Sequence, residues 1–105
     1  MREIWQILSD AGADVIISGH DHHYERFSPQ TAAGVSDPVR GLRQFIVGTG
    51  GRSRYPALFA QPNTEIRADK VDGVLKMTLR ASDYSWAYVK TVSGAAVDAG
   101  TARCH

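Results

Sequence analysis

Apolar residues near the start of the chain recur with the period of a helix. Between residues 2 and 11 they fall at Ile4, Ile7, Leu8 and Ala11, and the positions between them are mostly polar. Spacings of three and four residues place these side chains on one face of a helix. The pattern therefore predicts an amphipathic helix over residues 2–11.

A short strand is expected directly after this helix. Gly12 stands where a helix commonly ends with a positive φ. The run Val15-Ile16-Ile17 is β-branched and ends at Ser18-Gly19. Because successive residues of a strand point to opposite faces, a continuous apolar run predicts burial on both faces. We therefore expect a central strand of a layered α/β sheet.

The middle of the chain combines loops with one more short strand. Residues 20–28 are polar and aromatic, and residues 29–38 read as a loop that two prolines interrupt. The segment Gln44-Phe45-Ile46-Val47 predicts a second strand, which runs into Gly-Thr-Gly-Gly at 48–51. Residues 52–69 show no period, so we predict an extended loop there with a helical turn near 57–60.

The last third of the chain alternates as antiparallel strands do. Leu75, Met77 and Leu79 share one face of residues 74–80, and residues 84–92 are aromatic and β-branched after a turn at 81–83. These segments predict a hairpin, and residues 96–103 add a weak edge strand. A helix, a buried strand and mainly antiparallel strands together predict a single α+β (layered α/β) domain over residues 1–105.

Composition narrows the function classes. The 105 residues carry a net charge of +1, with 43% hydrophobic and 22% charged residues. This balance gives no reason to expect a nucleic-acid partner, and no apolar run is long enough to cross a membrane. Residues 1–5 do not read as a secretory signal. Cys104 is the only cysteine, so a metal site would need histidines and carboxylates.

Three of the four histidines follow the predicted buried strand, in Gly19-His20-Asp21-His22-His23. Ligand sites of layered α/β sheets collect at the C-terminal ends of strands. Residues i and i+2 of an extended chain point to one side, so His20 and His22 can bind one metal ion or one each of two. Asp21 would point away from the metal and accept the second ring N–H of a histidine.

Other residues near this segment allow two interpretations each. His23 points to the opposite side, either as a group that supports the ligands or faces substrate, or as a packed ring. Glu25 and Arg26 suggest an ion pair at the start of a strand, either as an internal pair of the scaffold or as an ordinary surface ion pair. The backbone N–H groups of the glycine turn can form an anion-binding nest, or the glycines can simply permit a tight turn, which we favour. The residues of that turn and the adjoining cation are Gly48, Thr49, Gly50, Gly51 and Arg52.

The histidine segment carries a family resemblance. Ser18-Gly19-His20-Asp21-His22-His23-Tyr24-Glu25-Arg26 resembles the G-H-x-H-x-Y-E-R segment of the calcineurin-like metallophosphoesterases, in the branch of the purple acid phosphatases. The stretch Phe45-Ile46-Val47-Gly48-Thr49-Gly50-Gly51 resembles the strand and glycine turn that follow it there. The ending at residues 102–105 resembles exported bacterial members. The resemblance implies the C-terminal portion of a phosphoesterase β-sandwich.

The resemblance also implies a reaction and its residues. His20 would ligate one metal and His22 the other, in a dinuclear centre of Fe, Zn or Mn ions. That centre would activate hydroxide for attack on a phosphate ester. His23 would be a catalytic helper near the leaving group, while Asp21 and the turn from Gly48 to Arg52 would support the ligands or line the substrate pocket.

The family's other metal-binding motifs are missing from this sequence. No Gly-Asp or Gly-Asn dipeptide occurs, and no histidine precedes His20. We therefore expect a C-terminal part of a metallophosphoesterase domain that binds metal weakly and turns over little by itself. Cys104 would either pair with a cysteine of the absent half or remain a free thiol, and a full-length protein would be exported.

Two alternatives remain open. One is a catalytically inactive half-domain that acts as a weak metal-binding or interaction module, with a missing N-terminal half or a second copy as its partner. The other is a single-zinc loop, which would need a third ligand from Asp21, His23, Glu25 or His105.

Overall fold

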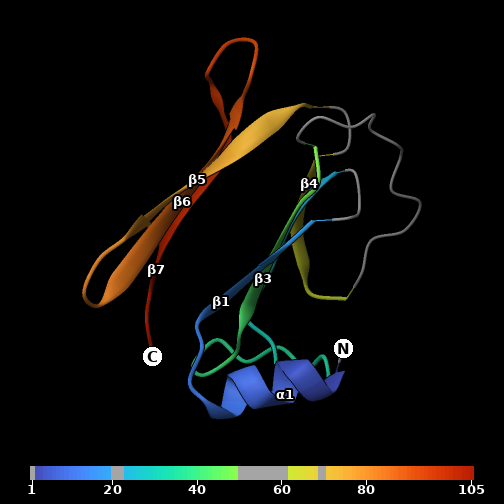
Figure 1. Cartoon of the computed structure of the whole chain (residues 1–105), viewed down its shortest axis with the longest axis vertical. Helices are drawn as coiled ribbons and strands as arrows, with labels where there is room; N and C mark the ends of the chain where they lie inside the picture. Colours follow the sequence, from blue (N-terminus) through green and yellow to red (C-terminus); the bar gives the residue numbers. More distant parts are fainter. Residues whose placement is uncertain (1, 20–22, 50–61, 69–70) are drawn as a thin grey trace.

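The computed structural model describes residues 2–19, 23–49, 62–68 and 71–105, which form one helix and two β-sheets (Figure 1). The helix α1 spans Arg2–Asp10. The four-stranded sheet contains β1 (Val15–Ser18), β2 (Tyr24–Phe27), β3 (Arg43–Val47) and β4 (Thr64–Ala68). The three-stranded sheet contains β5 (Gly73–Leu79), β6 (Asp83–Lys90) and β7 (Ala96–Arg103). The described part of the chain is therefore mainly β, with one short helix.

The predicted helix and its end are confirmed. Gly12 has a φ of 82°, which glycine adopts without a steric penalty. The amide of Ala13 donates to the carbonyl of Leu8 over 3.0 Å and closes the last turn. Figure 1 shows α1 at the end of the first sheet where β1 begins. Across the described ranges, no helix has the length and apolarity that spanning a membrane requires.

The strand β1 lies at a sheet edge, which corrects the prediction of a central strand. The order of the first sheet is β1-β3-β2-β4, and β1 pairs parallel to β3 with Ser18 opposite Ile46. In the described part of the chain β1 has no neighbour on its other side. Its central residue Ile17 is 53% exposed. The apolar run therefore forms the strand that was predicted, but the described chain does not cover it on both sides.

The strand β4 corrects the prediction of a loop over residues 52–69. It pairs antiparallel to β2, with Ala68 opposite Tyr24 and Ile66 opposite Arg26. Its sequence Thr-Glu-Ile-Arg-Ala is too short and too polar to reveal a strand by its own pattern. Pairing with β2 supplies the missing stabilisation. The helical turn predicted near 57–60 lies outside the described residues.

The remaining strand predictions are confirmed. The strand β3 contains the predicted segment 44–47, and β5 and β6 form the hairpin, with Leu75 opposite Tyr88 and Leu79 opposite Tyr84. The strand β7 pairs antiparallel to β6 and forms the outer strand of this sheet.

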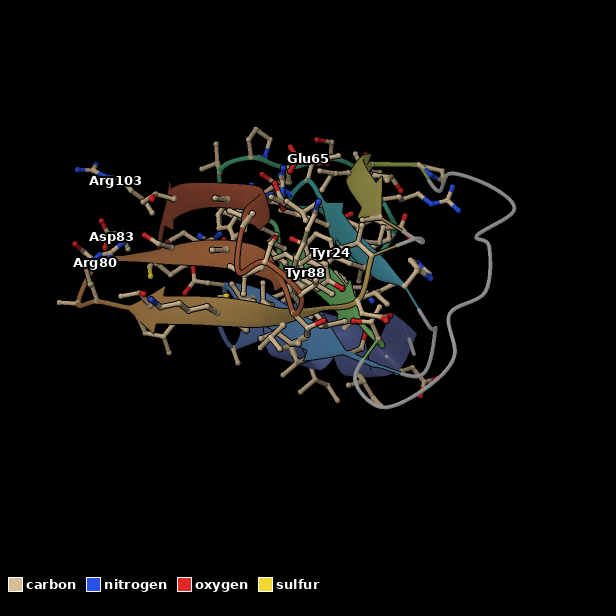
Figure 2. The ribbon with its side chains drawn as sticks, turned by 90° about the horizontal axis from the view of Figure 1, so that it is seen from above. Tyr24, Glu65, Arg80, Asp83, Tyr88 and Arg103 are labelled. Atoms are coloured by element: carbon tan, nitrogen blue, oxygen red, sulfur yellow. The ribbon has the colours of Figure 1, made fainter. Side chains whose placement is uncertain are left out.

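The core of the described chain consists of aromatic side chains where the two sheets face each other. Tyr24 and Phe45 come from the first sheet, and Tyr84, Trp86 and Tyr88 come from β6. The rings of Tyr24 and Tyr88 stack with centroids 4.0 Å apart, and Figure 2 shows them side by side. Phe45 meets Trp86 edge-on at 5.5 Å. The aromatic side chains of β6 therefore pack against β2, which begins directly after the histidine segment, and against β3, which lies between β1 and β2.

Candidate functional site

The C-terminal ends of β1 and β3 lie beside each other. Because the two strands are parallel and in register, Gly19 leaves β1 next to Val47, the last residue of β3. A Cβ atom on Gly19 would lie 3.7 Å from the carbonyl oxygen of Val47. Gly48 and Thr49 continue from β3 at the same edge. This is the kind of edge where layered α/β sheets place their ligands.

The histidine segment is anchored at its second end by His23. The carbonyl of His23 accepts a hydrogen bond from the amide of Gly48 over 3.1 Å. The imidazole is only 6% exposed, and its Nε2 atom lies 2.8 Å from Oε1 of Glu25. The structure thus shows a packed ring, and a catalytic role for His23 stays a prediction. His20, Asp21 and His22 lie outside the described residues.

Glu25 faces several donors but not its neighbour Arg26. It is 3% exposed and accepts a hydrogen bond from Oγ1 of Thr64 over 2.5 Å. Nε of Arg67 lies 4.0 Å from its Oε1 atom. The predicted ion pair between Glu25 and Arg26 is wrong, because adjacent side chains of a strand point to opposite faces.

Arg26 instead binds Asp98, a residue of β7 that the sequence analysis did not single out. Its Nε and Nη2 atoms donate to the two carboxylate oxygens over 2.7 and 3.1 Å. The same carboxylate accepts from the hydroxyl of Tyr24 over 2.6 Å and from Nε1 of Trp86 over 3.2 Å. Arg26 also pairs with Glu65, which binds Arg43 as well. This network connects β2 with β4, β6 and β7.

The pKa directions agree with a charged pair at the centre of this network. Burial alone would raise the pKa of Asp98, but hydrogen bonds from Arg26 and Tyr24 outweigh it and hold that pKa below the ordinary value. Burial, followed by the hydrogen bond to Asp98, raises the pKa of Tyr24. Tyr24 is therefore a neutral donor to an ionised carboxylate.

Thr49, a predicted pocket residue, binds the second sheet. Its side chain is buried, and its hydroxyl lies 2.8 Å from the hydroxyl of Tyr88 and 3.2 Å from the carbonyl of Gly73. The glycine turn is thus joined to β5 and β6 at Thr49 and to His23 at Gly48. Gly50, Gly51 and Arg52 lie outside the described residues.

The described residues do not complete a metal site by themselves. Within ranges 2–19, 23–49, 62–68 and 71–105, no three or more His, Cys, Asp or Glu side chains are grouped to hold a metal ion. Hydrolytic zinc sites use three protein ligands and an open position. Nε2 of His105 lies 3.4 Å from Oδ1 of Asp14. Because Asp14 precedes β1, His105 lies at the opposite end of this strand from Gly19.

A cavity of about 460 Å³ lies at this opposite end. Asp14, Arg43, Tyr84, Cys104 and His105 are among its lining residues. Cys104 is exposed. The cavity is therefore separate from the edge of the sheet at which β1 and β3 end.

Comparison with known sequences gives a partial match. No family model matches the chain. Two uncharacterized proteins, from two strains of Mycobacterium tuberculosis, are 30% identical to it over 84 residues. The match covers 63% of this chain and 16% of each of those proteins. The chain therefore spans about one sixth of the curated relatives that it matches.

Comparison with solved structures gives the fold. The purple acid phosphatase PPD1 from yellow lupin (Lupinus luteus) seeds superposes with a TM-score of 0.82 at 23% identity, over 93% of this chain and 19% of the lupin chain. GAP50, the anchor in the inner membrane complex of Plasmodium, superposes with a TM-score of 0.76 at 17% identity, over 94% of this chain and 28% of its own. The chain thus has a phosphoesterase-like fold, similar to part of a purple acid phosphatase.

Proposed function

We propose that this chain contributes His20 and His22 to the dinuclear metal centre of a phosphoesterase. The observation that carries the proposal is the position of Gly19 and His23 on the two sides of the C-terminal end of β3. His20, Asp21 and His22 connect these two points in the sequence, and this supports the proposal that the two histidines bind metal at the edge where β1 and β3 end. The similarity in fold to a purple acid phosphatase supports the class of reaction.

In this proposal the chain supplies part of the site. Metal ions bound there would neutralise charge on the phosphate oxygens and make water a nucleophile near neutral pH. His20 and His22 would each hold one ion, and the glycine turn after β3 would line the substrate side of the pocket. Imidazole ligands suit Fe, Zn and Mn, so the proposal does not depend on one metal.

Replacing both His20 and His22 with alanine should remove the metal-binding capacity of the segment. Zinc binding to the 105-residue chain, measured by competition with a chromophoric chelator, should be weak and should fall by at least about tenfold in the double variant. A longer polypeptide that carries further ligands should hydrolyse p-nitrophenyl phosphate and lose this activity in the same variant.

The matched control is His105→Ala, because His105 lies at the opposite end of β1. This variant should bind zinc and turn over substrate as the unmodified protein does. Undiminished zinc binding and turnover in the double variant would contradict the proposal.

An interaction module is the second candidate function, and exposed apolar side chains favour it. Ile17 on β1 and Ile4 and Ile7 on α1 are all more than half exposed. An unpaired strand edge beside apolar side chains promotes association with another polypeptide. The partner would be an N-terminal half of the same domain or a second copy of this chain.

Replacing Ile17 with threonine should weaken self-association of the chain. Threonine keeps the β-branched shape that suits a strand but removes apolar surface at the free edge. Sedimentation velocity over a range of concentrations should show less oligomer than for the unmodified chain. Val92→Thr is the control, since Val92 is 97% exposed in the turn after β6. Equal loss of oligomer in both variants would argue against association at β1.

A further inference from the structure

A buried polar pair lies at the point where the histidine segment joins β2. His23 and Glu25 are 6% and 3% exposed, and their side chains meet at 2.8 Å between Nε2 and Oε1. Both groups lose their hydration when the chain folds, and their bond to each other compensates part of that loss. The mechanism proposed above does not use Glu25.

The surroundings of Glu25 determine the direction of this hydrogen bond. Its other oxygen accepts a hydrogen bond from Oγ1 of Thr64, and the guanidinium of Arg67 approaches its Oε1 atom to 4.0 Å. A carboxylate that faces a hydroxyl donor and a cation is itself an acceptor. Nε2 of His23 must then carry the hydrogen.

The other ring nitrogen of His23, Nδ1, is in a different environment. A neutral imidazole with hydrogen on Nε2 has a bare acceptor at Nδ1. This Nδ1 atom is buried and has no hydrogen-bond partner among the described residues. Among the described residues the ring is therefore held by its Nε2 bond to Glu25 and not by Nδ1.

We propose that Glu25 is a positioning residue for the metal-binding segment, because it holds His23 in the tautomer with hydrogen on Nε2. The bond from Gly48 to the His23 carbonyl holds the backbone of the same residue. Together the two bonds fix the end of the segment that carries His20 and His22, so that less freedom is lost when a ligand binds. The role at a metal centre rests on the proposed function, whereas the tautomer is a property of the chain without metal.

The tautomer can be measured directly in the metal-free chain by long-range proton–nitrogen NMR of the imidazole rings. His23 should carry its hydrogen on Nε2. Glu25→Ala should abolish this preference, and Glu25→Gln should keep it because the amide oxygen can accept the same bond. Glu65→Ala is the control, since Glu65 pairs with Arg26 and Arg43. Hydrogen on Nδ1 in the unmodified chain, or an unchanged preference in Glu25→Ala, would overturn the inference. If Glu25→Ala does not fold, the unmodified chain and Glu25→Gln still decide it.

Zinc binding tests the positioning role and separates it from the proposed function. Glu25→Ala should weaken binding about tenfold, and Glu25→Gln should restore it. If His20→Ala and His22→Ala leave zinc binding unchanged, or the chain binds no zinc, the proposed function and the positioning role fail together, and the NMR measurement still decides the tautomer. If those variants lose zinc and Glu25→Ala does not, the positioning role fails while the proposed function stands.

Discussion

Replacing Asp98 with alanine is expected to lower the free energy of unfolding by about 3–5 kcal/mol. Asp98 is 8% exposed and holds the guanidinium of Arg26 with two hydrogen bonds. The substitution leaves this cation partly buried without its main partner, and it also removes the acceptor of Tyr24 and Trp86. Domains of this size are stabilised by roughly 5–15 kcal/mol, so much of the total is lost.

Urea unfolding followed by circular dichroism measures this effect. The matched control is Asp83→Ala, because Asp83 pairs with Arg80 at the tip of the β5–β6 hairpin, as Figure 2 shows. Exposed pairs of this kind contribute about 0–1 kcal/mol. A loss of the same small size in Asp98→Ala would mean that the buried network does not hold the sheets together.

The contribution of Asp98 should also depend on pH. Its pKa in the folded chain lies below the ordinary value of 3.8. A lowered carboxyl pKa stabilises the fold above the unfolded pKa, and this stabilisation is lost as the pH falls through the folded pKa. The unmodified chain should therefore lose stability below about pH 4. Asp98→Asn should lack this component of the acid dependence.

Replacing Trp86 with alanine should cost about 3–5 kcal/mol of unfolding free energy. The indole lies between the sheets, where Phe45 meets it edge-on. The guanidinium carbons of Arg26 and Arg43 lie 5.1 and 5.0 Å from its ring centroid. Alanine removes the ring from all these contacts at once and leaves a cavity where the sheets meet.

Trp5→Ala is the control for this substitution, since Trp5 is the other tryptophan and lies on α1, outside the core between the sheets. Urea unfolding of the two variants should show a distinctly smaller loss for Trp5→Ala. Equal losses would contradict the assignment of Trp86 to the centre of the core.

The elements that the sequence predicted are those with a complete local pattern. The helix before Gly12 and the alternation of Leu75, Met77 and Leu79 identify α1 and β5 without knowledge of any partner. The strand β4 escaped prediction because Ile66 is the only large apolar residue in its five positions. The run Val15-Ile16-Ile17 predicted a strand covered on both sides, whereas the described chain supplies a single neighbour.

The residues of the candidate site also differ in whether a local sequence pattern reveals them. His20 and His22 are recognisable as candidate ligands because they lie within a single short motif. Asp98 is 72 residues from Arg26 in the sequence, and only the packing of β7 beside β6 brings the two together. No pattern near Asp98 indicates its partner, although a carboxylate within a run of small and apolar residues is a signal that could have been followed.

The hydrogen bonds that join Thr49 to Tyr88 and Gly73 show which side chains influence the proposed pocket from a distance. Thr49 adjoins the proposed substrate pocket, yet its hydroxyl is oriented by a sheet that carries none of the proposed ligands. Tyr88 also stacks on Tyr24, the first residue of β2 after the histidine segment. A designer who wishes to shift the pocket without touching a proposed ligand should therefore vary Tyr88, whose hydroxyl contacts that of Thr49.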